Sequence, residues 1–353
     1  MTTIMSNDCF GSVLLRQRSM TGGLEVDKTY DLIVAVLSWE QRATYAFLSS
    51  PAIVSDITAI WFESTSPEIE DRKESQYRLL CSHFKVVNAA RLAVATDVEG
   101  NYLLFQQIIE ERYSQLRRPL KVLIDISCLP KNYLLFLLGL GFSNDYFACF
   151  DCVYSAGQYD LLSDAADEAD EAGRIHRALV SAGDWTARQV PFFGGRDVFP
   201  KTKDLVVSVG GELGLTVPFV VKAEPRKLTL IFIQETAPSE HAEMLESERS
   251  AYRTLMSEPS VVSAEFGLND SLGVANFLQD CANASDADCV SLMVLGSKSH
   301  AIAVGLVGLA NERVEVVCRV PKSYRRLDVL PAGGIFLYQI EDRFEPLNYL
   351  DPR

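Results

Sequence analysis

The sequence predicts an α/β protein with two tandem Rossmann-like parallel-sheet domains that arose by internal duplication. Short apolar runs alternate with amphipathic stretches, which indicates strands joined by helical crossovers. Four segments of the first half also recur in order in the second half, and the matched pairs are Asp31–Glu40 with Asp204–Glu212, Ile57–Glu63 with Leu228–Glu235, Asp97–Phe105 with Asn269–Phe277, and Val122–Lys131 with Leu292–His300. An ordered series of matches favours duplicated domains with sites in matched pairs.

The first domain is expected over residues 29–160, after an irregular polar segment at residues 1–28. Continuous apolar runs predict its buried strands at Leu32–Leu37, Ile57–Phe62, Ala89–Ala95, Val122–Ile126 and Phe150–Tyr154. Helices are predicted between them at Glu40–Leu48, Ile69–Phe84, Tyr102–Leu116 and Asn132–Leu140.

An acidic helical connector and linker is expected over residues 161–203, with Pro191–Lys203 as the domain boundary. The second domain is expected over residues 204–320, with strands at Leu205–Val209, Leu228–Ile233, Val261–Phe266, Cys289–Leu295 and Val314–Cys318. Residues 321–353 are expected to form a basic loop at Pro321–Arg326 and a closing strand at Ile335–Ile340, paired with the segment before it.

The formal net charge of −14 argues against a groove for long nucleic acid, which needs clustered lysine and arginine. A small anionic ligand held by backbone amides and a few basic side chains stays compatible with it. The eight cysteines lack metal-ligand spacing and are expected to be reduced thiols. The most apolar stretch, Tyr133–Phe142, is too short to span a bilayer. We therefore expect a cytoplasmic protein without membrane contact.

Ligands of doubly wound sheets bind beyond the carboxyl ends of the strands, where the strand order reverses. The turns after the fourth strands are therefore candidate sites. They carry Ser127 and Lys131 in the first repeat, and Gly296, Ser297, Lys298 and His300 in the second. Serine, lysine and a helix N-terminus suit phosphate or another anion, although a plain N-cap serine and solvated lysines are the alternative.

The turns after the first strands are the second group of candidates, and they contain Ser38, Glu40 and Arg42 in one repeat and Gly210 and Glu212 in the other. The recurrent glutamate suggests hydrogen bonds to a ribose or base. The basic segment after the last strand contains Tyr324 and Arg325, which could close over an anion with the tyrosine stacked on a base. A solvated loop is the alternative.

The sequence contains no recognised catalytic constellation. It lacks a Walker A loop, a zinc-protease helix motif and a nucleophile elbow, and Gly210–Gly214 does not meet dinucleotide-loop spacing. His300 alone among four dispersed histidines falls in an expected crevice, where it could act as an acid or base or simply lie at a helix start. We expect no cofactor or metal, and a binding protein rather than an enzyme.

The segment Asp125–Lys131 resembles the polar turn after strand four of CARF domains, and two such units in one chain are similar in plan to SAVED domains. In this sequence Cys128, Leu129 and Pro130 stand where those turns carry glycines, whereas Gly296–Lys298 is nearer the pattern. The resemblance implies a sensor of nucleotide second messengers in prokaryotic antiviral defence. Because no effector domain is recognised, it also implies a separate effector protein as partner.

Three classes of function stay open at this point. The first is a nucleotide-type sensor or regulatory subunit, the second a metal-independent nucleotide phosphodiesterase resembling ring nucleases, and the third a ligand-free scaffold of a defence complex. A homodimer is compatible with each of them.

Overall fold

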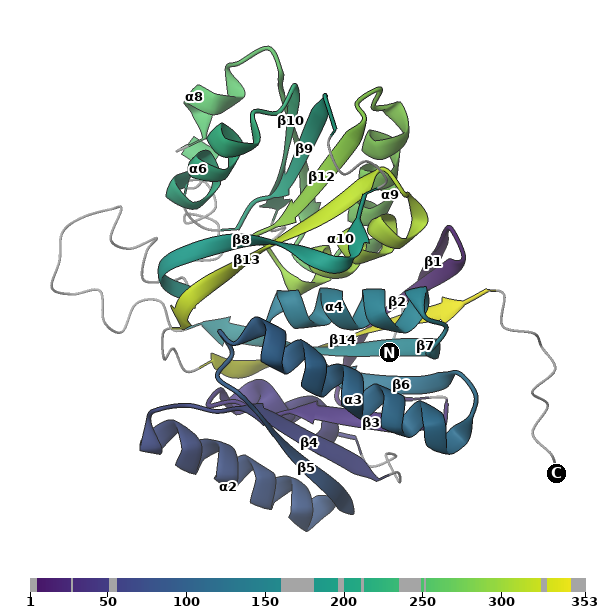
Figure 1. Cartoon of the computed structure of the whole chain (residues 1–353). Coiled ribbons are helices and arrows are strands. Elements are labelled where there is room, and N and C mark those ends of the chain that lie inside the picture. Colours follow the sequence, from purple (N-terminus) through teal and green to yellow (C-terminus); the bar gives the residue numbers. More distant parts are fainter. Residues whose placement is uncertain are drawn as a thin grey trace, which may run out of the picture.

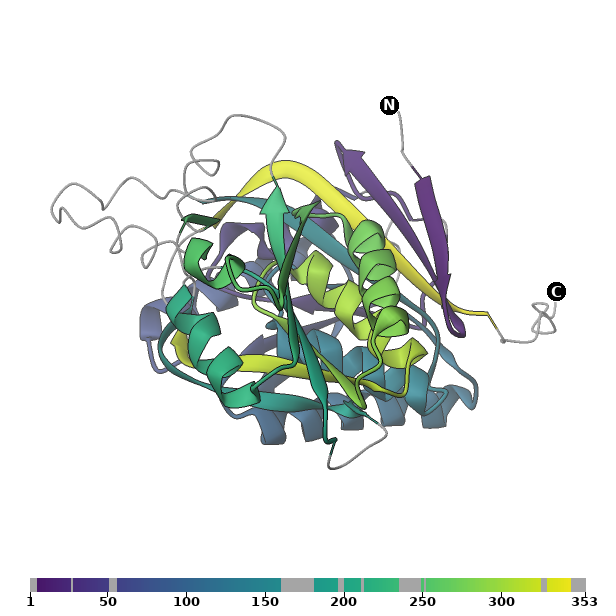
Figure 2. The same cartoon turned by 90° about the horizontal axis from the view of Figure 1, so that it is seen from above.

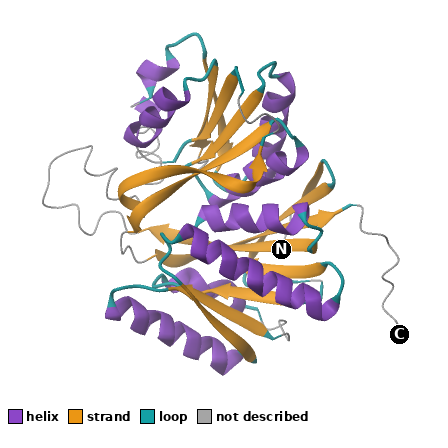
Figure 3. Ribbon diagram, viewed as in Figure 1, coloured by secondary structure: helices purple, strands orange, loops and turns teal. Residues whose placement is uncertain are grey.

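The computed structural model describes residues 5–26, 28–50, 56–159, 181–195, 200–210, 213–234, 249–250, 252–324 and 329–343. It contains two sheets of mostly parallel strands, with helices on both faces of each (Figures 1 and 3). The predicted α/β class with two Rossmann-like domains is therefore confirmed. We call the parts built around the two sheets the first and the second lobe.

The first sheet has the strand order β1-β2-β14-β7-β6-β3-β4-β5. Its strands are β1 (Met5–Phe10), β2 (Val13–Thr21), β3 (Leu32–Val36), β4 (Ile57–Phe62), β5 (Val86–Leu92), β6 (Leu120–Asp125), β7 (Phe147–Tyr159) and β14 (Val329–Asp342). Its helices are the short η1 (Gln41–Thr44) and α1 (Tyr45–Leu48), followed by α2 (Pro67–His83), α3 (Val98–Leu116) and α4 (Lys131–Ser143).

The second sheet has the strand order β11-β10-β9-β12-β13-β8. Its strands are β8 (Ser181–Gly194), β9 (Lys203–Ser208), β10 (Lys227–Gln234), β11 (Val261–Gly267), β12 (Cys289–Val294) and β13 (Val314–Tyr324). Its helices are α6 (Leu213–Ala223), α8 (Arg253–Met256), α9 (Ser271–Ala284) and α10 (Lys298–Ala310).

The two sheets share one plan for their parallel strands. The series β5-β4-β3-β6-β7 and β11-β10-β9-β12-β13 place corresponding strands in the same order. In each sheet the order in which successive strands are added therefore reverses between the first and the fourth parallel strand, which lie side by side. A local motif is repeated as well. Asp97 accepts a hydrogen bond from the amide of Gly100 at the start of α3, and Asp270 does the same for Gly273 at the start of α9. Strand order and matched caps together support the duplication.

The lobes exchange strands with each other. After β7 of the first sheet, the next described strand is β8, which pairs antiparallel with β13 of the second sheet. After β13, the next described strand is β14, which pairs antiparallel with β7 and β2 of the first sheet. Figure 2 shows the last strand lying beside the N-terminal hairpin. Each lobe is therefore completed by a strand that follows the other lobe's fifth parallel strand.

This exchange differs from three expectations. Residues 1–28 contain the β1–β2 hairpin, whereas an irregular segment was expected. The expected linker contains edge strand β8, and Pro191 fits there because an edge strand can leave a backbone position unpaired. The closing strand pairs with β2 and β7 instead of the segment before it, and residues 321–324 of the expected basic loop belong to β13. The acidic run at residues 164–171 lies outside the described residues.

A continuous apolar core joins the two lobes. Helix α4 is buried on all sides, as its uniformly apolar sequence predicts, and it packs against α10 and β8 of the second lobe. Gly305 of α10 lies so close to Leu138 of α4 that a Cβ there would come within 2.8 Å of its side chain. One cluster of buried side chains includes Ile124 from the first sheet and Leu292 from the second. The lobes therefore share part of their hydrophobic stabilisation.

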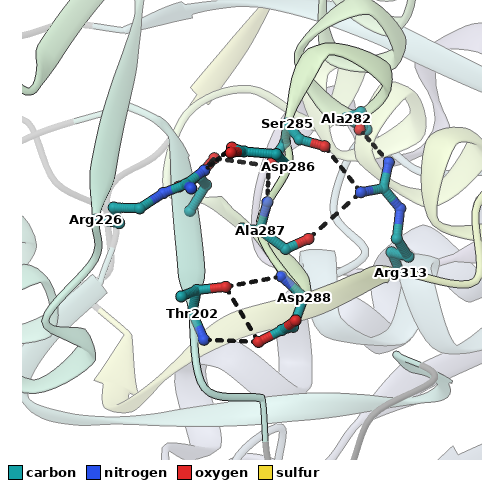
Figure 4. Close-up of polar contacts among 9 residues, drawn as sticks. Thr202, Arg226, Ala282, Ser285, Asp286, Ala287, Asp288 and Arg313 are labelled. Carbon is teal, nitrogen blue, oxygen red and sulfur yellow. Dashed lines mark hydrogen bonds and ion pairs between the residues drawn. The ribbon is translucent and has the colours of Figure 1, made fainter.

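The amino-terminal edge of the second sheet is fixed by a polar network (Figure 4). The Arg313 guanidinium donates to the backbone carbonyls of Ala282 at 2.7 Å and Ser285 at 2.9 Å. Asp288 accepts from the backbone amide of Thr202 at 2.9 Å, and Arg226 bonds both Asp204 and Asp286. These contacts tie the loop before β12 to the neighbouring strand, at the edge opposite the turns considered next.

Candidate functional site

The turns after the first and fourth parallel strands of both lobes converge where α4 and α10 begin. We use the name interlobe cluster for Glu40, Arg42, Asp125, Ser127, Lys131, Gly296 and Lys298. Contact between α4 and α10 brings it together, because each helix begins at one of its two lysines. The structure therefore assembles one junction from turns that the sequence placed in two separate crevices.

The two lysines cross between the lobes in a reciprocal way. The ammonium group of Lys131 donates to the backbone carbonyls of Leu295 at 2.5 Å and Gly296 at 2.6 Å. The ammonium group of Lys298 donates to the backbone carbonyl of Ser127 in the first lobe. Each lysine thus caps the fourth turn of the opposite lobe, and neither forms an ion pair with a described residue.

Holding these two cations together is costly. Burial, together with the nearby charges of Lys298 and Arg319, lowers the pKa of Lys131 to about 8. Burial, followed by the charge of Arg42, lowers the pKa of Lys298 to about 8 as well. Each shift from 10.5 corresponds to a cost on the order of 3 kcal/mol while the amine is protonated, and this cost is relieved as the pH rises above 8. Such a cost, which the nearby carboxylates do not offset, is typical of a functional site.

The first turn of the first lobe presents a buried ion pair. The Arg42 guanidinium donates to the Glu40 carboxylate at 2.7 Å, and both side chains are almost fully buried. Arg42 also lies 3.3 Å from the Tyr154 hydroxyl. Gln76 of α2 accepts from the Ser38 amide and donates to the Glu40 carbonyl, so it fixes the turn from outside. Sequence patterns gave no signal for Gln76.

Asp125 is a member of the cluster that was not among the residues predicted to contact a ligand. It is the last residue of β6 and is fully buried. Its Oδ1 accepts from the Ser127 amide at 2.8 Å, while its Oδ2 has no hydrogen-bond partner among the described residues. Burial raises the pKa of Asp125 to about 6, against the opposing hydrogen bonds from Ser127. A carboxylate that ends an apolar strand was the available sequence signal.

His300 supports the turns of the second lobe. Its Nδ1 lies 2.8 Å from the Ser208 hydroxyl, and its Nε2 lies 3.1 Å from the Gly267 carbonyl. A carbonyl can only accept, so Nε2 carries the proton and Nδ1 accepts from Ser208. Burial lowers the pKa of His300 to about 4, which keeps the ring neutral. Tyr133 makes the corresponding contact in the first lobe, because its hydroxyl donates to the backbone carbonyl of Ala95 at 2.8 Å.

The remaining predicted site residues either have local structural roles or cannot be assigned one. Ser297 is the N-cap of α10 and accepts from the His300 amide at 3.1 Å, which is the plain capping role. Ser127 is fully buried, and its hydroxyl accepts from the Ser155 amide. Tyr324 ends β13, and nothing further is described of its side chain. Glu212 and Arg325 lie outside the described residues, so their predicted roles stay predictions.

Within the described part of the chain, no group of three or more histidine, cysteine, aspartate or glutamate side chains could hold a metal ion. The same residues include no helix that is long and apolar enough to cross a membrane. What the cluster offers chemically is a set of amine, guanidinium and carboxylate groups, which can bind and orient an anionic ligand.

No protein-family model matches the chain, and no curated protein matches it. Among solved structures it is similar to a functionally unknown protein, PA1789, from Pseudomonas aeruginosa PAO1, with 14% identity over 82% of this chain and 92% of that chain, at a TM-score of 0.24. It is also similar to a putative universal stress protein from Pseudomonas aeruginosa UCBPP-PA14, with 14% identity over 82% of this chain and 93% of that one, at a TM-score of 0.24. A TM-score this low carries no argument about function.

Proposed function

We propose that the chain is a sensor that binds a small nucleotide-type anion at the interlobe cluster and regulates a separate effector protein. The observation that carries the proposal is the reciprocal pair of buried lysines, each of which bonds, within the described chain, to backbone carbonyls of the opposite lobe. A phosphate oxygen is a stronger acceptor for an ammonium group than a carbonyl, since the hydrogen bond is charge-assisted on both sides. An anion would therefore be stabilised where the free protein holds like charges together.

The polar groups around the lysines favour a nucleotide over a bare phosphate. The Glu40 and Asp125 carboxylates lie near Lys298, and both can accept hydrogen bonds from a ribose hydroxyl or a base. The resemblance of Asp125–Lys131 to CARF turns supports the same ligand class and a place in antiviral defence. The second-messenger identity of the ligand rests on that resemblance.

The exchanged strands give a route from ligand to effector. A ligand that takes over an interlobe ammonium group replaces a contact that joins the lobes, and α4 and α10 begin at the two lysines. Because the lobes share a core and exchange β8 and β14, a shift at the junction changes how the whole surfaces of the lobes are arranged. A separate effector protein could bind one arrangement of the lobes in preference to the other.

Calorimetry of the purified chain with cyclic di-AMP and cyclic tri-AMP tests the proposal. We expect binding that weakens with added salt, and a loss of affinity of at least about tenfold in the double variant Lys131→Met/Lys298→Met, because the charge-assisted bonding that the interlobe lysines offer disappears. Circular dichroism must show that the double variant is folded. The absence of heat with every cyclic di- and trinucleotide, in a folded protein, would contradict a messenger sensor. Turnover of the nucleotide would instead favour the phosphodiesterase alternative.

A further inference from the structure

The two crevices of the duplicated fold differ at the point where their strands separate. In the second lobe β9 and β12 stay paired up to Ser208 and Val294, and the amides of Leu295 and Gly296 both donate to the Ser208 carbonyl. In the first lobe β3 and β6 are paired only up to Val34 and Ile124. The corresponding first-lobe strands thus separate one residue pair earlier, directly before Asp125.

Backbone fills the second-lobe crevice. A Cβ on Gly210 would lie 2.3 Å from the Cα of Gly296, and a Cβ on Gly296 would lie 2.8 Å from the Val209 carbonyl oxygen. The two turns therefore touch through backbone atoms that directly follow the paired strands. Room for a ligand between them would require breaking that pairing, which the polar network at the other end of β9 and β12 also opposes.

Side chains fill the first-lobe crevice. The charges of Arg42, Glu40 and Asp125 all act on Lys298, which reaches in from the second lobe. Asp125 Oδ2 is buried there and has no hydrogen-bond partner in the described chain. Side chains can change rotamer for a ligand without breaking the pairing of β3 and β6, and an unpartnered buried oxygen gains from a new donor. Lys131, by contrast, extends towards the backbone-filled crevice and forms two carbonyl bonds there.

We infer that the chain has one composite binding site, in which the first-lobe crevice holds the ligand and the second lobe supplies Lys298. This inference rests on the proposed function and specifies which residues contact each part of the ligand. The phosphate contacts Lys298 and Arg42, and an N–H or O–H donor of the base or ribose contacts Asp125 and Glu40. The second-lobe crevice is a scaffold, so the matched pair of sites expected from the duplication is replaced by a single asymmetric one.

The duplication supplies a matched comparison, because Lys131→Met and Lys298→Met each remove one interlobe lysine from the first position of a 13-residue helix. Titration with cyclic di-AMP and cyclic tri-AMP should give one ligand per chain for the unmodified protein. We expect Lys298→Met to weaken binding at least about tenfold and Lys131→Met less than about threefold. Both variants should show similar changes in melting temperature, since each loses a buried ammonium group that bonds backbone carbonyl oxygen of the opposite lobe.

Two ligands per chain, or equal losses of affinity in both variants, would overturn the single-site inference while leaving the sensor proposal intact. Absence of binding to the unmodified chain would instead remove the sensor proposal and this inference with it. If Lys298→Met does not fold, Asp125→Asn provides the second arm. This isosteric change should weaken binding by about tenfold, because the carboxylate charge is lost and an NH2 donor replaces one acceptor oxygen. Unchanged affinity in Asp125→Asn would contradict the first-lobe assignment.

Discussion

Leu337→Ala in β14 is expected to destabilise both lobes together, by about 2–5 kcal/mol, the usual cost of truncating a buried leucine. Leu337 is fully buried in the first sheet, although its strand follows β13 of the second sheet along the chain. Because the lobes exchange strands and share a core, loss of packing in one should be transmitted to the other. Trp61 of β4 and Trp185 of β8 can report the two sheets separately.

Denaturant unfolding followed in single-tryptophan variants measures this coupling. The Trp61 and Trp185 transitions should coincide in the parent protein and shift by the same amount in Leu337→Ala. Leu330→Ala is the control in the same strand, since Leu330 is 44% exposed and its truncation should cost less than about 0.5 kcal/mol. A shift of the Trp61 transition alone would show that the lobes unfold independently.

Replacement of His300 by phenylalanine should remove a pH-dependent part of the stability. The folded-state pKa of about 4 lies below the ordinary value of 6.5, so the unfolded chain binds the proton more readily between these values. The stabilisation is therefore complete above about pH 6.5 and is lost as the pH falls towards 4. By linkage, the advantage of the parent protein over His300→Phe should shrink by about 2 kcal/mol between pH 7.5 and pH 5.

The comparison of parent and variant is necessary because Asp125 acts in the opposite direction. Its raised pKa of about 6 gives stability at low pH that is lost as the pH rises from about 4 to 6. This contribution is common to both proteins and cancels in their difference. The measurement is urea unfolding of both proteins at the two pH values. A difference in unfolding free energy that stays constant with pH would show that burial does not hold His300 neutral.

Local patterns were sufficient for the parallel core but not for the way the lobes are joined. The buried strands β3, β4, β6, β9, β10 and β12 are continuous apolar runs, and this composition is visible without knowledge of their neighbours. The partners of β8 and β14 depend on pairing between distant segments, which periodicity does not specify. Pro191 and the nearby glycines resemble a linker in sequence, although an edge strand tolerates them.

The sequence also predicted several residues of the candidate site but not how the lobes bring them together. Lys131 and Lys298 stood out because they recur after equivalent strands, and the structure brings them to one junction. Their reach across to the opposite lobe could not be inferred, since it depends on the packing of α4 against α10. Asp125 was predicted only as the first residue of the CARF-like turn and not as a ligand contact, because it is the last residue of β6 and precedes the turn itself. The asymmetry of the crevices appears only in strand pairing.

The central claim, that an anion binds at the buried interlobe lysines, is tested most directly by proton uptake on binding. Both lysines have a pKa of about 8 in the free protein, so each is partly deprotonated at pH 8. A bound phosphate raises the pKa of each lysine that it contacts, so binding at pH 8 should take up as much as about half a proton per contacted lysine, while binding at pH 6.5 should take up almost none at the lysines. Calorimetry with cyclic di-AMP or cyclic tri-AMP, in two buffers of different ionisation enthalpy at pH 8, gives this number. Uptake that disappears in Lys131→Met/Lys298→Met, together with binding, is the predicted result, and binding at pH 8 with no uptake of protons would contradict the account.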